Sequence, residues 1–188
     1  MQLTLVIIAS LFAFVGNLPY LRSVLKGETE PHAYTWFVWS IVSLVTFFGQ
    51  TAKGAGLGAI PTGVSEMFTI LIFFFSLKNG FKHVKKIDSV ILVVCILGLI
   101  PWYLTKDPTI SVIVVVSIDV IAFIPTLRKT WRYPGTEKPI LYIMNVSRHA
   151  LSLFALEAYN VATTLHSIFM IITNSLMSIF ILRKKSKE

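Results

Sequence analysis

Two charged side chains lie inside long apolar stretches of the sequence. Asp119 lies near the middle of the apolar run 109–127, and Arg148 lies near the middle of a later run, 140–157. A lone charge in hydrocarbon costs at least ~2.5–3.5 kcal/mol on insertion scales, so each of these groups needs a partner or a function. If the two runs are neighbouring antiparallel helices, both charges lie at a similar depth. The pattern therefore predicts that they pair, either directly or through one water, and face the interior of the protein.

Two interpretations of this pair remain open. In the first, Asp119 and Arg148 form a structural ion pair that holds two helices together. In the second, both side chains face a path for a polar solute, and Asp119 is a site that binds and releases a proton. The two interpretations differ in whether removing both charges together would leave function intact.

Further polar side chains recur at helical spacing, so that they share a face of their helix. Trp39 and Gln50 lie on one face of the run 33–52, and Asn145 lies three residues before Arg148. Ordinary packing explains many Ser and Thr residues at such positions, whereas amide, indole and charged groups suit binding of a polar solute. The candidate solute-binding residues are Asn17, Trp36, Trp39, Gln50, Glu66, Asp119, Asn145, Arg148 and Asn174.

No arrangement of catalytic or metal-binding residues is apparent. The four His residues are scattered and the single Cys lies within an apolar run, so no cluster has the spacing of a zinc site. The net charge of +8 comes from basic residues at the edges of apolar segments, which is typical of membrane topology rather than of nucleic-acid binding. We expect no enzymatic activity, no cofactor, no metal and no nucleic-acid partner.

Membrane-spanning helices are the elements that must position these side chains. Of the 188 residues, 55% are hydrophobic and 14% are charged, whereas a soluble domain averages about 25% charged residues. At 1.5 Å rise per residue, a run of this length crosses a hydrocarbon core of ~30 Å. The sequence therefore predicts an all-α membrane protein with seven transmembrane helices, at 3–22, 33–52, 60–77, 88–104, 109–127, 140–157 and 161–182.

The distribution of basic residues predicts the orientation of these helices. Of the 17 Lys and Arg residues, all but Lys53, Lys106 and Arg148 lie in the loops after the first, third and fifth runs or after the seventh. Basic residues accumulate on the cytoplasmic side of a membrane protein. We expect the C-terminus in the cytoplasm, the N-terminus outside, and a location in the plasma (inner) membrane of a bacterium.

The sequence also contains an internal repeat. The pentapeptide at 18–22, Leu-Pro-Tyr-Leu-Arg, matches Ile-Pro-Thr-Leu-Arg at 124–128, and each leads to a tract with Gly, Thr-Glu and Pro, at 27–31 and 135–139. Two three-helix units separated by one linker helix have the same orientation in the membrane, which makes the repeat parallel. The predicted arrangement is 3+1+3, with units 1–78, 79–106 and 107–188.

This arrangement resembles the SWEET and PQ-loop transporters, which have seven helices arranged 3+1+3 and a Pro near the inner ends of helices one and five. A Gln often follows that Pro in the family, where this chain has Tyr20 and Thr126. Residues 26–39 also resemble a group of uncharacterised bacterial membrane proteins. The resemblance implies an Asn and a Trp around the solute, roles that Asn174 and Trp36 or Trp39 could fill.

We therefore predict a small-solute transporter that works by alternating access at a midplane site, with Pro19 and Pro125 as hinges. The resemblance covers carriers of sugars and of amino acids, so the solute stays open. The expected partners are the lipid bilayer, a small polar metabolite and, as a candidate coupling ion, the proton. The alternative is a heptahelical receptor or ligand-binding protein without net transport.

Overall fold

The computed structural model describes residues 2–104 and 107–185, and within them the chain forms helices and no strands. This confirms the prediction of an all-α protein with seven helices. Two short 3-10 turns, η1 (Gly56–Ala59) and η2 (Pro134–Thr136), precede α3 and α6. The helices are α1 (Gln2–Leu25), α2 (Ala33–Ala52), α3 (Ile60–Asn79), α4 (Lys86–Leu104), α5 (Pro108–Arg132), α6 (Pro139–Phe154) and α7 (Val161–Lys185).

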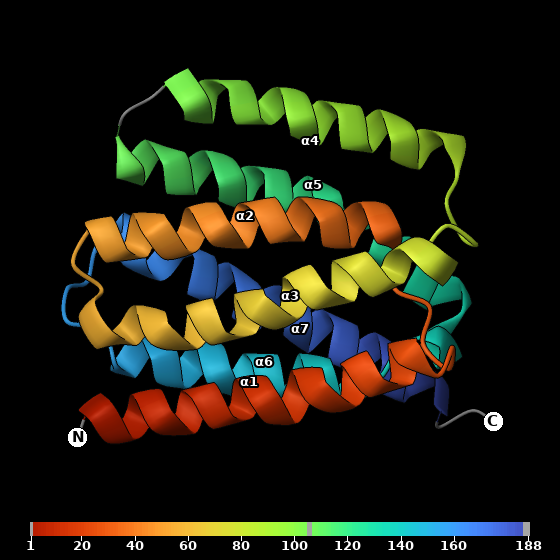
Figure 1. Ribbon diagram of the computed structural model, residues 1–188, viewed down its shortest axis with the longest axis horizontal. Coiled ribbons are helices and arrows are strands. Elements are labelled where there is room, and N and C mark those ends of the chain that lie inside the picture. Colours follow the sequence, from red (N-terminus) through yellow and green to blue (C-terminus); the bar gives the residue numbers. More distant parts are fainter. Residues whose placement is uncertain (1, 105–106, 186–188) are drawn as a thin grey trace.

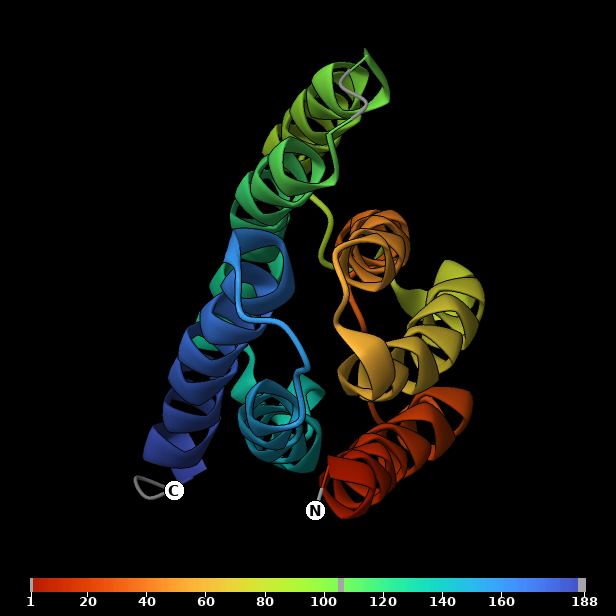
Figure 2. The same cartoon turned by 90° about the vertical axis from the view of Figure 1, so that its left-hand side faces the viewer.

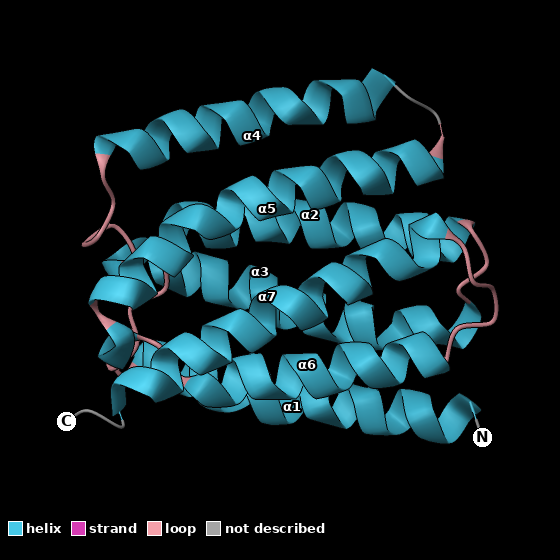
Figure 3. Ribbon diagram, turned by 180° about the vertical axis from the view of Figure 1, so that it is seen from behind, coloured by secondary structure: helices cyan, strands magenta, loops and turns pink. Residues whose placement is uncertain are grey.

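The seven helices run roughly along one axis in alternating directions, so the connections gather at two ends (Figure 1; Figure 3 shows the same from behind). We call one end the basic end, where loops 26–32, 80–85 and 133–138 lie together with the end of α7. The opposite end carries the start of α1 and the loops 53–59 and 155–160. Lys106 and Lys187, which the topology prediction counted, lie outside the described residues.

The packing of the helices follows a regular order. Helix α3 packs against both α1 and α2, and α7 packs against both α5 and α6. Between these two groups, α1 packs against α6 and α2 packs against α5. Helix α4 lies at the edge of the bundle, where it contacts α5 and, to a smaller extent, α2 (Figure 2).

The outer surface of the bundle is apolar, while many polar side chains are buried inside it among apolar ones. Five helices, α1, α2, α3 with its preceding turn, α5 and α7, are long and apolar enough to cross a membrane. Large side chains such as Leu3, Leu11 and Phe14 of α1 are exposed, whereas Asn17 on the same helix is buried. Because exposed apolar and buried polar side chains suit lipid as the solvent, the chain is an integral membrane protein.

Small residues allow α1 and α6 to approach closely. Ala9, Ala13 and Gly16 form one buried stripe of α1, a pattern typical of helix contacts within membranes. A Cβ atom placed on Gly16 would lie 2.8 Å from Cβ of Met144 in α6. The residue at position 16 therefore limits how near the two helices come.

Four helix ends differ from the sequence prediction by three residues or more, one of them that of α7, which ends at Lys185 instead of 182. Helices α1 and α5 continue to Leu25 and Arg132, beyond the predicted ends at 22 and 127. Proline removes only one helical hydrogen bond, and the extra turns are held by buried polar contacts at the basic end. Helix α6 ends at Phe154, three residues before the predicted 157, because residues 155–160 turn to cover the opposite end.

Candidate functional site

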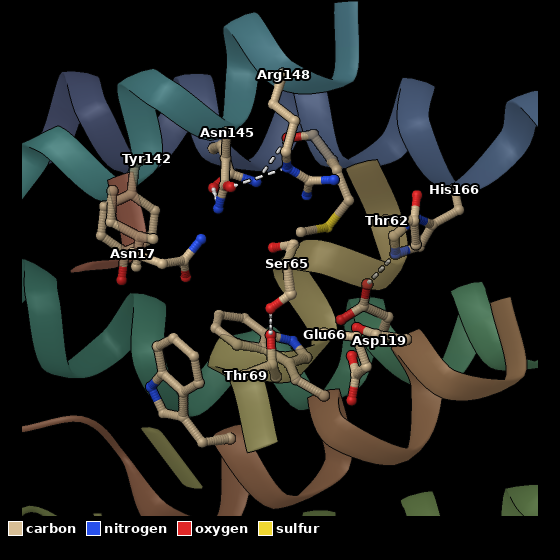
Figure 4. A pocket seen from close by; sticks show the side chains of 16 residues that line it. Asn17, Thr62, Ser65, Glu66, Thr69, Asp119, Tyr142, Asn145, Arg148 and His166 are labelled. Carbon is tan, nitrogen blue, oxygen red and sulfur yellow. Dashed lines mark hydrogen bonds and ion pairs between the residues drawn. The ribbon is translucent and has the colours of Figure 1, made fainter. Parts of the chain in front are cut away.

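A polar cavity lies inside the bundle, between the helices α1–α3 and α5–α7. Its volume is about 40 Å³, enough for a few water molecules. Eight of the predicted solute-binding residues line it, from six different helices, as Figure 4 shows for those it labels. They are Asn17, Trp36, Trp39, Glu66, Asp119, Asn145, Arg148 and Asn174.

Asp119 and Arg148 are both buried and line the same cavity, but no direct ion pair within 4.0 Å joins them among the described residues, so that part of the prediction is wrong. The Asp119 carboxylate instead lies 3.9 Å from Nε2 of His166. Arg148 turns toward the start of α3, where Nη1 donates to the carbonyl oxygen of Pro61 at 3.4 Å. Depth and helix face follow from sequence, but the acceptor that a long side chain reaches depends on its neighbours in space.

His149 holds the guanidinium of Arg148 in place. Nη2 of Arg148 lies 2.6 Å from Nε2 of His149, and Nδ1 of His149 lies 3.2 Å from the hydroxyl of Ser167. A guanidinium can only donate hydrogen bonds, so Nε2 accepts and His149 is neutral with its proton on Nδ1. Arg148 therefore keeps its positive charge among neutral hydrogen-bond acceptors.

Two amides continue this hydrogen-bonded chain. Nε of Arg148 donates to Oδ1 of Asn145 at 3.4 Å, and Nδ2 of Asn145 donates to Oδ1 of Asn174 at 3.3 Å. Nδ2 of Asn174 then donates to the carbonyl oxygen of Met170 at 2.8 Å. Since the guanidinium donates at one end and a helix carbonyl accepts at the other, both amide orientations are determined.

Glu66 presents a carboxylate to the cavity without a hydrogen-bond partner. Its side chain is buried, and neither Oε1 nor Oε2 has a partner among the described residues. The hydroxyl of Ser43 and the guanidinium of Arg148 line the same cavity. The hydroxyl of Thr62, one turn earlier in α3, also lacks a partner. Buried polar groups in this state are suited to contact a ligand or water.

Aromatic side chains form one wall of the cavity. The rings of Trp36 and Trp39 meet edge to face at 5.2 Å, and Trp39 stacks on Phe123 at 5.8 Å. The indole N–H groups of both tryptophans are buried without a hydrogen bond, although that of Trp39 lies near Asp119. An indole wall beside carboxylates favours a flat or cationic group.

A buried cluster around Glu137, which we call the basic-end seal, closes the cavity toward the basic end. Nζ of Lys129 donates to Oε1 of Glu137 at 2.5 Å, and the hydroxyls of Tyr20 and Tyr142 donate to Oε2 at 3.0 and 2.9 Å. Lys129 also donates to the carbonyl oxygen of Glu30. Tyr142 lines the cavity as well, so the seal lies directly against it.

Contacts between two loops complete the basic-end seal. The backbone N–H of Glu30 donates to the carbonyl oxygen of Thr136 at 3.2 Å. On the surface, Nζ of Lys138 lies 3.4 Å from Oε2 of Glu28. The seal was not predicted, because Lys129 lies among basic residues expected in a surface loop, whereas its side chain is 1% exposed. The repeated tracts at 27–31 and 135–139 are the feature of the sequence that could have indicated a contact between these loops.

A second buried ion pair joins α4 to the rest of the basic end. Both terminal nitrogens of Arg128 donate to the carboxylate of Asp88, at 2.7 and 2.6 Å, and His32 lies 3.3 Å from the same carboxylate. Burial lowers the pKa of His32 to about 4, against the opposing effect of Asp88. His32 is therefore neutral near pH 7.

A second set of contacts, the opposite-end seal, closes the other end. Nε2 of Gln50 donates to the carbonyl oxygen of Thr163 at 3.3 Å, and Nδ2 of Asn160 donates to that of Lys53 at 3.3 Å. The N–H of Leu57 donates to Glu157 at 3.3 Å. Gln50 was predicted to bind solute, but it belongs to this seal and does not line the cavity.

The two predicted hinges lie in corresponding parts of their helices. Pro19 and Pro125 both occur inside a helix, in its last third, toward the basic end. Pro125 is buried beneath α4 while Pro19 is exposed. The hydroxyl of Thr35 donates to the carbonyl oxygen of Ala122 at 3.0 Å, in the turn that Pro125 interrupts.

Comparison of the chain with protein-family models, with curated proteins and with solved structures finds no match. Among the described residues, no group of three or more His, Cys, Asp or Glu side chains is placed to hold a metal ion. The candidate site therefore rests on its own geometry, a polar cavity with one seal on either side.

Proposed function

We propose that the protein is a small-solute membrane carrier that works by alternating access. One observation carries the proposal, namely a polar cavity halfway along the bundle with a seal at each end. Each seal joins α1–α3 to α5–α7: Tyr20 with Glu137 at the basic end, and Gln50 with Thr163 at the opposite end. Breaking one seal while the other holds would open the cavity to one side of the membrane only.

We propose that the two halves are the repeats of a 3+1+3 arrangement, 1–78 and 107–188, with 79–106 as linker. The packing order supports this, because α3 lies between α1 and α2 as α7 lies between α5 and α6. The contacts α1–α6 and α5–α2 then correspond by a two-fold axis along the bundle. Such an axis along the membrane normal is the expected symmetry of a parallel repeat.

Individual contacts support the same symmetry. Gly16 approaches Met144, and Ala122 accepts a hydrogen bond from Thr35. Position 122 lies 106 residues after position 16, the same offset as between Pro19 and Pro125. Position 144 lies 109 residues after position 35, the offset that aligns Trp36 with Asn145 and Trp39 with Arg148. The same pair of positions therefore mediates both contacts between the halves.

The buried pairs at the basic end correspond in the same way. In the first half, the hydroxyls of Ser23 and Thr29 lie 2.6 Å apart. Ser23 corresponds to Lys129 when the two Pro motifs are aligned, and Thr29 corresponds to Glu137 when the Gly and Pro of the two tracts are aligned. Lys129 and Glu137 form an ion pair at 2.5 Å. Each pair ties the end of a helix to the loop that follows it. Only the second pair is charged, so closure of the basic end depends mainly on that half.

In this proposal, the two halves rock about the midplane cavity, with Pro19 and Pro125 as hinges where the helical hydrogen bonding is interrupted. The conformation described has both seals formed, and its cavity of about 40 Å³ holds water but not a metabolite. Loading would require the cavity to widen as one seal opens.

We propose that the basic end faces the cytoplasm of a bacterial cell and that the start of α1 is outside, on the positive-inside rule. The proposed 3+1+3 arrangement resembles that of the SWEET and PQ-loop transporters, and we propose membership of that superfamily.

Counterflow in proteoliposomes tests the proposal. Vesicles with purified protein, preloaded with an unlabelled sugar or amino acid, should accumulate the same labelled solute for at least one member of a panel. Protein-free vesicles and vesicles with the basic-end seal cross-linked are the controls. Saturable binding without counterflow of any bound solute would contradict the carrier and support the receptor alternative.

A further inference from the structure

The cavity contains three ionisable side chains of the Arg, Asp and Glu types, and no close ion pair joins them to one another among the described residues. Arg148 contributes one positive charge, and Glu66 and Asp119 contribute two carboxylates. No ion pair within 4.0 Å joins Arg148 to either carboxylate among the described residues, and the ring of His149 beside it is neutral by its hydrogen bonds. Buried charges without close partners are costly, so the cavity is built for a ligand or water to complete it.

Arg148 has donors left over for an anion. A guanidinium has five N–H groups, and the structure gives Nε, Nη1 and Nη2 one partner each. Two of these contacts are long, at 3.4 Å. One N–H on each terminal nitrogen remains, and both can donate to a carboxylate.

Glu66 and Asp119 have acceptors left over for a cation. Both oxygens of Glu66 lack hydrogen bonds although the residue is only 4% exposed. Asp119 has the ring of His166 at 3.9 Å, beyond hydrogen-bond distance, and the indole of Trp39 nearby. Figure 4 shows Glu66, Asp119 and His166 toward one end of the cavity, with Arg148 nearer its middle.

We infer that the solute of this carrier is a zwitterion of the amino-acid type, with its carboxylate on Arg148 and its ammonium group on the carboxylates of Glu66 and Asp119. The inference rests on the proposed function and names the solute class for the same site. A neutral sugar would leave all three charges without a counter-charge. A simple anion would leave both carboxylates unpaired, and a simple cation would leave Arg148 unpaired.

The hydrogen-bonded amides of Asn145 and Asn174 orient the guanidinium of Arg148. Because Asn145 and Asn174 relay hydrogen bonds from Nε to a helix carbonyl, while Pro61 and His149 each take one N–H of a terminal nitrogen, one N–H on each terminal nitrogen is left for the solute. Trp39 lies near Asp119, where a cationic group would also contact an indole face.

Binding to the purified protein in detergent tests the inference without requiring transport. The readout is the thermal unfolding midpoint, with competition against a labelled ligand once one is found. The probes are the standard amino acids, the leucine analogues isopentylamine and 4-methylpentanoate, which each lack one charged group, and the neutral sugars glucose and sucrose. At least one amino acid should raise the midpoint, and both single-charge analogues and the sugars should not.

Three variants assign the charges. Glu66→Gln removes a charge but no hydrogen bond, so it should fold normally and bind the amino acid about tenfold more weakly or worse. Arg148→Gln should abolish binding, and Arg148→Lys, which keeps the charge if the former fails to fold, should retain part of it. Lys78→Gln, which removes an exposed charge near the end of α3 and outside both seals, is the matched control and should bind as the unaltered chain does.

The outcomes separate this inference from the proposed function. Binding of a sugar but of no amino acid, with counterflow of that sugar, would overturn the zwitterion and leave the carrier intact. Binding of an amino acid without counterflow would support the zwitterion site and overturn the carrier. An amino acid that binds equally well to Glu66→Gln and Arg148→Gln, or no binding of any amino acid, would overturn the inference.

Discussion

At the scale of single residues, Glu137 joins three helices at the basic end. Its carboxylate receives Lys129 from α5, Tyr20 from α1 and Tyr142 from α6. It is 2% exposed, so its charge depends on these donors instead of water. A residue that joins three helices and one loop in this way determines whether the end is open or closed.

We predict strong coupling between Lys129 and Glu137. Lys129→Met leaves a buried carboxylate without its counter-charge and should cost about 3 kcal/mol of stability, as loss of one partner of a buried ion pair does. Glu137→Gln should cost a similar amount. The double variant should cost clearly less than the sum, measured as a double-mutant cycle on unfolding in detergent. Additive effects would mean that the pair does not form.

His32 predicts a pH dependence of stability. Its pKa is lowered to about 4 in the folded protein, against about 6.5 in an unfolded chain. Because the unfolded chain binds the extra proton, stability is full above about pH 6.5 and falls as the pH drops toward 4, by up to about 3 kcal/mol.

The variant His32→Asn provides the comparison for this prediction. Unfolding midpoints of both proteins in detergent, taken from pH 7 to pH 4, should converge as the pH falls, because only the unaltered chain loses the contribution of a neutral histidine. Parallel curves would show that His32 does not titrate in this range. Glu28 and Glu30 titrate in both proteins and so cancel in the difference.

Sequence reasoning at this scale succeeded in placing residues and failed in pairing them. Asp119 and Arg148 were predicted at mid-depth on inward faces, and both line the cavity. Their pairing was wrong because Arg148 finds neutral acceptors, Pro61 and His149, on two other parts of the chain. Hydropathy and spacing indicate depth and face, whereas partners depend on the positions of several helices at once.

At the scale of helices, the contact between α1 and α6 depends on Gly16. The change Gly16→Ala would place a Cβ atom 2.8 Å from Cβ of Met144. The helices would have to separate, at a cost of about 1–3 kcal/mol. Gly135→Ala is the matched control, because nothing lies within 4 Å of a Cβ there. Unfolding midpoints should fall for the first variant only, and equal midpoints would contradict the packing.

We expect that the loops 26–32 and 133–138 at the basic end separate during transport. Glu28 and Lys138 form a surface ion pair at 3.4 Å between the two loops, and the one native cysteine, Cys95, is buried. In a Cys95→Ala background, Glu28→Cys with Lys138→Cys can be joined by a short bifunctional thiol reagent. We predict that cross-linking stops counterflow and that reduction restores it.

Each single-cysteine variant, treated in the same way, is the control for that experiment and should transport normally. Continued counterflow with fully cross-linked protein would show that the basic end does not open in this manner. Sequence reasoning predicted the loops and their repeated tracts, but the contact between them could not be predicted. It depends on how two halves of the chain dock, which no local pattern specifies.

At the scale of the whole molecule, the number, order and direction of the helices follow from hydropathy alone, because a continuous apolar run in lipid has few alternatives to a helix. The ends of α1, α5 and α6 were less predictable, since polar turns at both ends of the bundle are stabilised by tertiary contacts. From the sequence, the cavity could be predicted only as polar faces on several helices. The two seals could not be predicted, because they are contacts between segments far apart in the sequence.

The orientation of the molecule in the membrane is the final prediction. Among the described loops, those of the basic end contain nearly all the Lys and Arg residues, and Lys53 is the basic residue of the opposite end. Several basic side chains pair with acids, as Arg128 does with Asp88 and Lys82 with Glu30. Acidic residues contribute little to the positive-inside rule, so these pairs leave the orientation unchanged.

A fluorescent reporter active only in the cytoplasm should be active after Glu188 and inactive after Lys53, and an exported phosphatase should give the reverse pattern. Activity of the fluorescent reporter after Lys53 and not after Glu188 would place the basic-end seal outside the cell, and the direction of access in the proposed cycle would reverse.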